Sequence, residues 1–299
     1  MRAESVPHCY LNGDWVPLAQ ASVSVLDRGF IFGDGIYEVV PVYQGVPFRA
    51  AEHYRRLVRS LSEVDIPVPM DEAGFMRLLQ GLIEHPGAPT AVDHTVYLQI
   101  TRGVAPRIHA APKGLQPTVF AMLQPMAPPS SQDLALGVRC VSAEEFRWGK
   151  GHIKSTSLLG AVLAREISAQ QQATETIMFR GDHLTEGSAS NVWVVQQGRV
   201  LGVPRDGGVL EGIRYSLIEG LCHDLGLGFE LRPITRAEVW GADELMLSSA
   251  SKEVLAVTRL DDEVIGTGQP GPIWQKLFDA YQQAKAAHIQ RARAARAAA

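Results

Sequence analysis

Lys154 is the residue whose surroundings in the sequence best suit covalent chemistry. It lies in the stretch GHIKSTSLLGAVLAREISAQ, directly after Ile153 and before a leucine-rich run that we expect to form a helix. An amine is nucleophilic only in its neutral form, and apolar surroundings favour that form because they disfavour the ammonium ion. A lysine in such a place is typical of Schiff-base formation with a carbonyl compound. The alternative is an ordinary surface lysine, although a helix start disfavours a cation.

A carboxylate and an anion-binding turn elsewhere in the chain would suit one carbonyl cofactor, pyridoxal phosphate. Glu186 in LTEGSASNVWVV is expected in a turn between strands and could hold the proton of the pyridine nitrogen. The stretch LEGIRYSL predicts a loop entering a helix, where Gly212 allows close approach and backbone N–H groups could bind phosphate. Arg56, which follows His53 on an expected helix face, could add a charged donor. Each feature alone also fits a solvated hairpin glutamate, a simple helix start or an exposed arginine.

A third feature could bind a substrate carboxylate. Arg107 and His109 lie two residues apart after an expected strand that ends at Ile100. In extended backbone, side chains two residues apart point the same way, and the arginine fork suits a carboxylate. The alternative is a solvent-facing basic loop.

Composition excludes several other classes of protein. A formal charge of −4 gives no reason to expect nucleic acid as a partner, and no run of about 20 apolar residues predicts a membrane span. The N-terminal stretch MRAESVPHCYLNGDW has no apolar core, so we expect no signal peptide. The cysteines are far apart with no CxxC, which indicates reduced cytoplasmic thiols without a zinc site or a disulfide framework. No P-loop and no G-x-S-x-G motif occurs.

Hydrophobic periodicity predicts mixed secondary structure on both sides of a Pro/Ser-rich linker at 125–133. Before the linker we expect a hairpin at 10–16, helices at 51–64 and 71–84, and strands at 35–42, 95–100 and 118–123. After the linker we expect strands at 137–141, 176–179, 191–195 and 245–248, and helices that begin near Gly212 and Ile273. The helix that follows Lys154 would have Ser155 or Thr156 as its N-cap and an apolar face formed by Leu158, Leu159, Val162, Leu163 and Ile167.

In order and spacing, the motifs DRGFIFGDGIYEVV, EHYRRL, IKSTSLLGAVLA, LTEGSASNV and SSASKEV resemble those of the fold-type IV pyridoxal-phosphate enzymes. This group contains D-amino-acid aminotransferases, branched-chain aminotransferases and aminodeoxychorismate lyases, and the resemblance runs from about Tyr10 to the helix near Ile273. It implies a two-domain α/β (α+β) fold that binds pyridoxal 5'-phosphate in the cleft between the domains. The smaller N-terminal α/β domain would span 1–124, and the larger C-terminal domain, with a pseudo-barrel, would span 134–299.

The resemblance also implies a role for each candidate residue. Lys154 would form the internal aldimine and carry the substrate proton, and Glu186 would partner the pyridinium nitrogen. The phosphate would be bound by Arg56, by the backbone at Ile213 and Arg214, and by the turn that contains Ser249 and Ala250, while Leu210 would pack against one ring face. Ala250 stands where relatives usually have a threonine hydroxyl, for which Ser249 and Ser251 are the alternatives. Ala189 and Arg214 also depart from the pattern, replacing a serine and a threonine.

The Arg-x-His pair resembles the carboxylate trap of D-amino-acid aminotransferases, which the neighbouring subunit supplies there, with Tyr37 as its third member. This resemblance implies a homodimer that catalyses ping-pong transamination between a D-amino acid, such as D-alanine, and a 2-oxo acid, such as 2-oxoglutarate. The alternatives within the fold are an L-branched-chain aminotransferase, an (R)-amine transaminase and an aminodeoxychorismate lyase. An alternative from another class is a non-catalytic binding protein on this fold.

Overall fold

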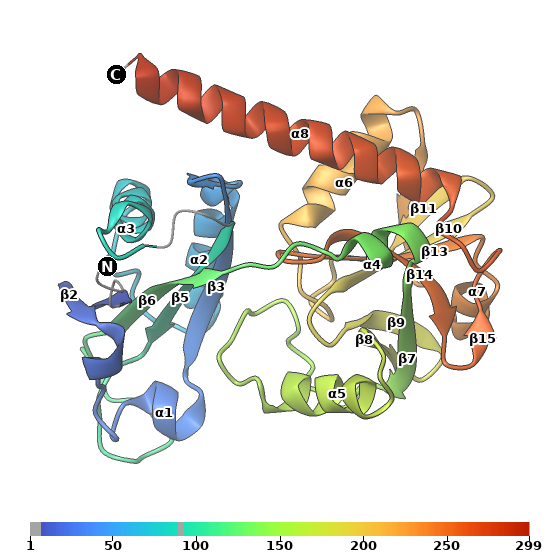
Figure 1. Ribbon diagram of the computed structural model, residues 1–299. Coiled ribbons are helices and arrows are strands. Elements are labelled where there is room, and N and C mark those ends of the chain that lie inside the picture. Colours follow the sequence, from blue (N-terminus) through green and yellow to red (C-terminus); the bar gives the residue numbers. More distant parts are fainter. Residues whose placement is uncertain (1–6, 89–92, 299) are drawn as a thin grey trace. The chain divides into compact units, whose positions relative to one another are not determined.

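The computed structural model describes residues 7–88 and 93–298 (Figure 1). Their contacts divide them into two compact units. The first contains the residues up to Ala127, the segment Ile153–Leu158 and the residues from Ala292, and the second contains Pro128–His152 and Leu159–Arg291. Residues 1–6, which begin the stretch expected to lack a signal peptide, and residue 299, at the end of the expected last helix, lie outside the described residues. A division into domains 1–124 and 134–299 stays a prediction, because compactness does not show that either part folds independently.

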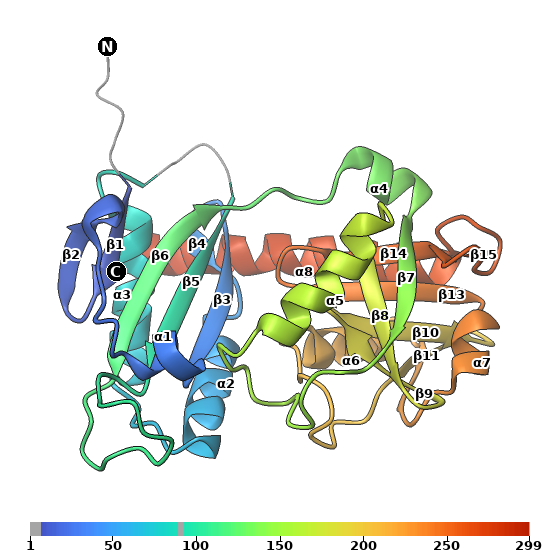
Figure 2. The same ribbon diagram turned by 90° about the horizontal axis from the view of Figure 1, so that it is seen from below.

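The first unit is built on a six-stranded antiparallel sheet with the order β2-β1-β6-β5-β3-β4 (Figure 2). Its strands are β1 (His8–Leu11), β2 (Asp14–Pro17), β3 (Gly35–Tyr43), β4 (Val46–Pro47), β5 (His94–Thr101) and β6 (Thr118–Pro125). Side chains along β5 alternate between buried and half-buried, as expected for a sheet that is covered more fully on one face. The buried face packs on two helices, α2 (Ala50–Glu63) and α3 (Glu72–Glu84), in one hydrophobic core. A short 3-10 helix, η1 (Leu18–Gln20), and α1 (Arg28–Phe32) complete this part of the chain.

Local sequence signals account for these elements. Asn12 and Gly13 both have positive φ, at 51° and 108°, and turn β1 into β2 as an Asn-Gly hairpin. Asp71 caps α3 by accepting a hydrogen bond from the N–H of Gly74 at 2.7 Å. The hairpin, both helices and the strands predicted before the linker are confirmed, with ends that differ by a few residues.

The second unit contains a nine-stranded mixed sheet with the order β12-β11-β10-β13-β14-β7-β8-β9, and β15 pairs with β14. Its strands are β7 (Val138–Glu144), β8 (Glu175–Arg180), β9 (His183–Gly187), β10 (Asn191–Gln196), β11 (Arg199–Gly202), β12 (Gly228–Leu231), β13 (Glu244–Ser249), β14 (Glu253–Leu260) and β15 (Glu263–Val264). The helices are α4 (Ser131–Leu136), α5 (Leu159–Gln170), α6 (Arg214–Asp224), α7 (Arg236–Trp240) and α8 (Pro272–Ala297). The strands and the last two long helices predicted after the linker are confirmed. None of the helices in residues 7–88 and 93–298 is both long and apolar enough to cross a bilayer.

Three local predictions in this half are wrong. The helix after Lys154 begins only at Leu159, so neither Ser155 nor Thr156 is its N-cap. Its buried residues are Ala164 and Ser168, whereas Leu159, Val162 and Leu163 of the expected apolar face are exposed. The helix α5 therefore lies against β7 and β8 through small side chains (Figure 2).

The third error concerns the segment that contains Glu186. Glu186 lies on β9, a strand that the sequence did not predict, and not in a turn between strands. The expected linker at 125–133 contains the boundary between the two compact units, at Ala127 and Pro128, and its role as an interdomain linker stays a prediction. It also contains the start of α4, where the Ser130 hydroxyl accepts a hydrogen bond from the N–H of Asp133 at 3.0 Å.

Candidate active site

Lys154 is held by backbone pairing with the beginning of β3 and not by a helix. Its carbonyl accepts a hydrogen bond from the N–H of Tyr37 at 3.0 Å, and Ser155 pairs with Ile36 in an antiparallel bridge. The preceding residue, Ile153, is buried in the hydrophobic core of the first unit. The lysine backbone is therefore fixed by a strand on one side and a core residue on the other, which restricts where its side chain can reach.

The amine of Lys154 lies against Tyr37. Its Nζ donates to the Tyr37 hydroxyl at 3.2 Å and lies 4.2 Å from the centre of the tyrosine ring. That ring stacks on Tyr97 of β5 with 5.8 Å between ring centres. Burial, with a smaller contribution from Tyr37, raises the pKa of Tyr97 to about 12. The half-buried lysine thus has the Tyr37 hydroxyl and an aromatic face as neighbours.

Arg56 lies in a buried ion-pair cluster. Its Nε and Nη2 donate to the two carboxylate oxygens of Glu38 at 2.7 and 2.8 Å, and Nδ1 of His53 lies 2.7 Å from the same carboxylate. Burial raises the pKa of Glu38, but Arg56 and then His53 outweigh it and hold the pKa well below its usual range. The alternative of an exposed surface arginine is therefore wrong, because Arg56 is buried and oriented by a charged partner. Its contact with a phosphate remains a prediction.

Glu186 is buried in the second unit and has three described hydrogen-bond donors. Nη2 of Arg147 lies 3.0 Å from Oε1, while the N–H of Leu210 and the amide of Asn191 donate to Oε2 at 3.2 and 3.3 Å. The Arg147 guanidinium also binds Glu145 at 2.6 Å. A carboxylate offers about four acceptor positions, so Glu186 can accept one further donor, such as a protonated ring nitrogen.

Burial raises the pKa of Glu186 to about 7, against 4.5 for an unperturbed glutamate. The Arg147 charge and the hydrogen bond from Leu210 act in the opposite direction, and Glu145 adds to the increase. The glutamate therefore lacks enough positive charge nearby to stay fully ionised, and an adjacent cation would supply it. The alternative of a solvated hairpin glutamate is wrong, since Glu186 is only 6% exposed.

The predicted phosphate-binding segments meet inside the second unit. The helix α6 begins at Arg214 with Ile213 as N-cap, and this residue forms no side-chain capping bond. The N-terminal end of a helix favours an anion. Gly212 is required here, because a Cβ would lie 2.1 Å from Oδ1 of Asn191. Nη2 of Arg214 donates to the carbonyl of Ala250 at 3.3 Å and to the Tyr281 hydroxyl at 3.1 Å. Arg214 thus connects the start of α6 to the turn between β13 and β14.

The turn from Ser249 to Lys252 is braced at both ends. The Ser249 hydroxyl accepts a hydrogen bond from the N–H of Lys252 at 3.1 Å. The Lys252 amine donates to the buried Glu175 at 3.0 Å, and Ser188 and Ser190 donate to the same carboxylate. This turn and the loop after Glu186 are therefore held by one buried anion. The phosphate roles of Ser249, Ala250, Ile213 and Arg214, and the ring contact of Leu210, remain predictions.

Arg107 and His109 are exposed and lie over the same aromatic ring. The Phe32 ring centre is 5.6 Å from the Arg107 guanidinium carbon and 5.5 Å from the centre of the His109 ring. The backbone is not extended as expected, because the N–H of Ile108 donates to the carbonyl of Pro106 at 2.8 Å in a three-residue turn. The two side chains nevertheless lie near the same Phe32 ring, whereas Tyr37 lies with Lys154.

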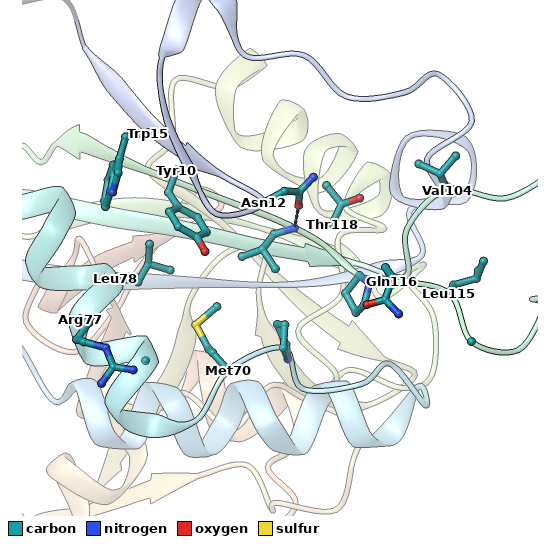
Figure 3. A pocket seen from close by; sticks show the side chains of 15 residues that line it. Tyr10, Asn12, Trp15, Met70, Arg77, Leu78, Val104, Leu115, Gln116 and Thr118 are labelled. Carbon is teal, nitrogen blue, oxygen red and sulfur yellow. Dashed lines mark hydrogen bonds between the residues drawn. The ribbon is translucent and has the colours of Figure 1, made fainter.

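A cavity of about 1000 Å³ lies in the first unit (Figure 3), and neither Lys154 nor Tyr37 lines it. Aromatic and aliphatic side chains from β1, β2 and α3 form one part of its wall, among them Tyr10, Trp15 and Leu78. Val104, Leu115 and Gln116 form another part. None of the residues predicted to bind cofactor or substrate lines this cavity.

The sequence did not indicate several residues that orient the candidate site. Glu38 holds Arg56, Arg147 and Asn191 hold Glu186, and Tyr281 binds Arg214. Arg147 belongs to FRWGKGHIK, where an arginine near a predicted catalytic lysine could have been weighed as a partner for a carboxylate. Asn191 lies five residues after Glu186 in the motif LTEGSASNVWVV and could have been weighed in the same way. Glu38 and Tyr281 carry no local signal, because their partners are 18 and 67 residues away.

This site and fold define a class of protein. Residues 35–260, most of the chain, match the sequence model of the family described as amino-transferase class IV. The chain belongs to this family, and the resemblance to fold-type IV enzymes drawn from its motifs is confirmed.

Two relatives within this family carry the same named activity. A D-alanine aminotransferase of Bacillus licheniformis is 35% identical over 271 residues, covering 91% of this chain and 94% of that protein. A D-alanine aminotransferase of Staphylococcus aureus strain MSSA476 is 36% identical over 275 residues, covering 92% and 96%. These relatives match the member of the family that the Arg-x-His pair predicted.

Solved structures confirm the predicted mixed α/β fold. The branched-chain aminotransferase of Escherichia coli superposes with a TM-score of 0.87 at 21% identity, covering 93% of this chain and 94% of that one. A PLP-bound form of a hypothetical aminotransferase from Mycobacterium tuberculosis has a TM-score of 0.81 at 19% identity, covering 92% and 97%. At these identities the likeness concerns the fold alone.

Proposed function

We propose that this chain is a pyridoxal-phosphate-dependent transaminase that moves an amino group from a D-amino acid, such as D-alanine, to a 2-oxo acid, such as 2-oxoglutarate, in a ping-pong cycle. The D-alanine aminotransferases at 35% and 36% identity support this substrate class. The observation that carries the proposal is the lysine amine of Lys154, fixed by β3 and in contact with Tyr37.

The donor set fits pyridoxal 5'-phosphate. Lys154 offers the amine that would hold the cofactor covalently, and Glu186 has acceptor capacity and a raised pKa suited to a cationic ring nitrogen. The N-terminal end of α6 at Ile213 and Arg214 would receive the phosphate, with Arg56 as a further cation. When bound, the cofactor supplies an electron sink for the charge that develops at the substrate Cα.

Lys154 and Glu186 would transfer or hold the protons of the reaction. With cofactor and substrate bound, the Lys154 amine would accept the proton from the substrate Cα and so act as the general base and acid of the reaction. The Tyr37 hydroxyl, 3.2 Å from Nζ, orients the amine for this transfer. Glu186 keeps the ring nitrogen protonated, with Arg147 fixing the carboxylate.

Arg107 and His109 would bind the substrate carboxylate and so select the D enantiomer. The side of the ring on which the carboxylate lies decides which enantiomer presents its Cα–H bond to Lys154. The two residues are exposed at the tip of a loop and converge over Phe32, which suits a ligand that approaches from solvent or from a second chain.

Formation of a homodimer would explain why the loop with Arg107 and the residues around it are exposed. The residues around α1 and the loop with Arg107 include a group of exposed apolar side chains: Val23, Val25, Leu26, Phe30, Val104 and Ile108. Phe30 is 72% exposed, which is unusual for a large aromatic side chain unless a partner covers it. We infer that a second copy covers this patch and that the trap serves the partner's site. Light scattering should give twice the chain mass for the wild type and a weaker dimer for Phe30→Glu, and a monomeric active wild type would contradict this part.

The proposal also includes a cytoplasmic location for the protein. Cys9, Cys140 and Cys222 are free and buried. Burial raises the pKa of each thiol, to about 12 for Cys222, which keeps it protonated and slow to oxidise. Buried thiols of this kind suit a reducing compartment.

Replacement of the lysine tests the proposal directly. Lys154→Ala should lower D-alanine turnover by about 10³-fold or more and remove the absorbance change seen when holoenzyme is treated with borohydride. Lys276→Ala, at an exposed position of α8, is the matched control and should leave both unchanged. Full activity in the Lys154 variant would overturn the proposed mechanism.

A further inference from the structure

The loop that carries Arg107 and His109, residues 103–117, is fastened to the rest of the first unit at its base. The N–H of Arg28 donates to the carbonyl of Gly103 at 2.9 Å, and Asp27 pairs with Val104 in an antiparallel bridge. Gly103 has φ of 99°, and a Cβ there would lie 2.0 Å from the carbonyl oxygen of Gln116. The two ends of the loop are therefore pressed together at this point.

The residues at the base of this loop do not hold its tip in position. Val104, Leu115 and Gln116 line the cavity of the first unit instead of closing on its core (Figure 3). Arg107, Ile108 and His109 are all exposed. Whatever orients the tip must reach it from another element.

The side chain of Arg28 makes that connection. Its Nη1 donates to the carbonyl of Ile108 at 2.6 Å and its Nη2 to the carbonyl of His109 at 3.0 Å. Its Nε donates to Asp34 at 2.7 Å, and the whole residue is only 4% exposed. A planar guanidinium with two of its nitrogens on successive carbonyls fixes the direction of the backbone between them.

Phe32 supports the same tip from below. It lies one helical turn after Arg28 on α1, so the two side chains share a face. The Phe32 ring centre is 4.8 Å from the Arg28 guanidinium carbon and contacts both Arg107 and His109. The short helix α1 therefore holds the tip in two ways. Arg28 binds the backbone of the tip, and Phe32 contacts the side chains of Arg107 and His109.

Asp34 anchors this arrangement and offers an internal control. Burial raises the pKa of Asp34, but hydrogen bonds from Arg102 and Arg28 outweigh it, and the pKa lies below its ordinary value. Arg102 binds Asp34 through Nε at 2.8 Å, much as Arg28 does. Its other nitrogens donate to the carbonyls of Val64 and Asp65, at the end of α2, and not to the loop.

We propose that Arg28 and Phe32 are positioning residues that hold Arg107 and His109 in the geometry that binds the substrate carboxylate. This inference rests on the proposed function, in which that pair is the carboxylate trap. Loss of Arg28 should therefore weaken carboxylate binding without removing the proton-transfer machinery at Lys154.

The test compares holoenzyme of the wild type with five variants: Arg28→Met, Arg28→Lys, Phe32→Leu, Arg102→Met and Arg107→Leu. Steady-state kinetics with D-alanine give KM and kcat, and calorimetry gives the Kd of propionate, which has the substrate's carboxylate but no amine. We expect Arg28→Met and Phe32→Leu to raise KM and the propionate Kd about tenfold or more, while kcat changes less than about threefold. Arg28→Lys, which keeps the charge beside Asp34, should recover part of the loss.

The control variants separate the possible failures. Arg102→Met should leave KM and the propionate Kd within about twofold of wild type. If Arg107→Leu weakens carboxylate binding and the Arg28 and Phe32 variants do not, the positioning inference is wrong and the trap stands. Equal effects of Arg28→Met and Arg102→Met would also overturn it, because they would indicate a general loss of structure. If Arg107→Leu itself leaves D-alanine and propionate binding unchanged, the proposed trap is wrong. If Arg28→Met does not fold, Arg28→Lys and Phe32→Leu decide the question.

Discussion

The buried carboxylate of Glu186 should make the stability of the cofactor-free protein depend on pH in a way that Glu186→Gln removes. Its pKa is about 7 in the folded chain against 4.5 for an unperturbed glutamate. At 1.36 kcal/mol per pKa unit this difference corresponds to roughly 3 kcal/mol. Because the folded pKa is the higher one, the folded state holds the proton more tightly. The associated stability is fully present below pH 4.5 and is lost as pH rises through 7.

Urea unfolding of apoenzyme between pH 4.5 and 8, at one protein concentration, measures this dependence. The free energy of unfolding of the wild type should fall relative to that of Glu186→Gln by roughly 3 kcal/mol across this range, with most of the change above pH 5. Subtracting the two curves removes the titration of unrelated groups. A difference that stays constant with pH would refute the reasoning, since it would mean that Glu186 is ionised throughout. A difference that grows in favour of the wild type would mean that Arg147 outweighs burial.

Two further predictions concern the residues that orient the site. Glu38→Gln leaves the Arg56 guanidinium buried without the Glu38 carboxylate, so it should lower the free energy of unfolding by about 3 kcal/mol above pH 5, measured by urea unfolding. The effect should become smaller as pH falls below 4.5, because the pKa of Glu38 lies well below its usual range in the folded chain. An unchanged urea midpoint would contradict this prediction. Gly212→Ala places a Cβ where Asn191 lies and should weaken pyridoxal phosphate binding to apoenzyme about tenfold in an absorbance titration. Gly220→Ala, where a Cβ meets nothing within 4 Å, is its control and should stabilise α6 by up to about 1 kcal/mol with unchanged affinity; equal affinities for both variants would show that Gly212 is not needed.

The sequence predicts the elements of the fold well where the signal is local. Asn12-Gly13 specifies a hairpin, and apolar spacing places α2 and α3 within one or two residues. The start of α5 was missed because Ser155, which has the chemistry of an N-cap, pairs with Ile36 of β3 instead. The backbone of Ser155 pairs with a strand that is distant in the sequence and is therefore not available for a helix. Local sequence rules do not predict such a long-range pairing.

The candidate site divides in the same way between local and distant information. Lys154 and Glu186 could be singled out because each lies in an informative motif, and the structure gives both the buried or half-buried setting that their chemistry needs. The pairings that orient the site residues were not predicted. Arg147 lies 39 residues from Glu186, and Arg28 lies 81 residues from His109, so only the folded chain brings them together.

The most direct test of the central claim is the initial rate with D-alanine, L-alanine and L-leucine, each with 2-oxoglutarate as amino acceptor. The proposed function predicts pyruvate formation from D-alanine with kcat/KM at least about 100-fold above that for either L-amino acid. Faster turnover of L-leucine, or equal rates for the two enantiomers of alanine, would contradict the assignment of this chain as a D-amino-acid transaminase.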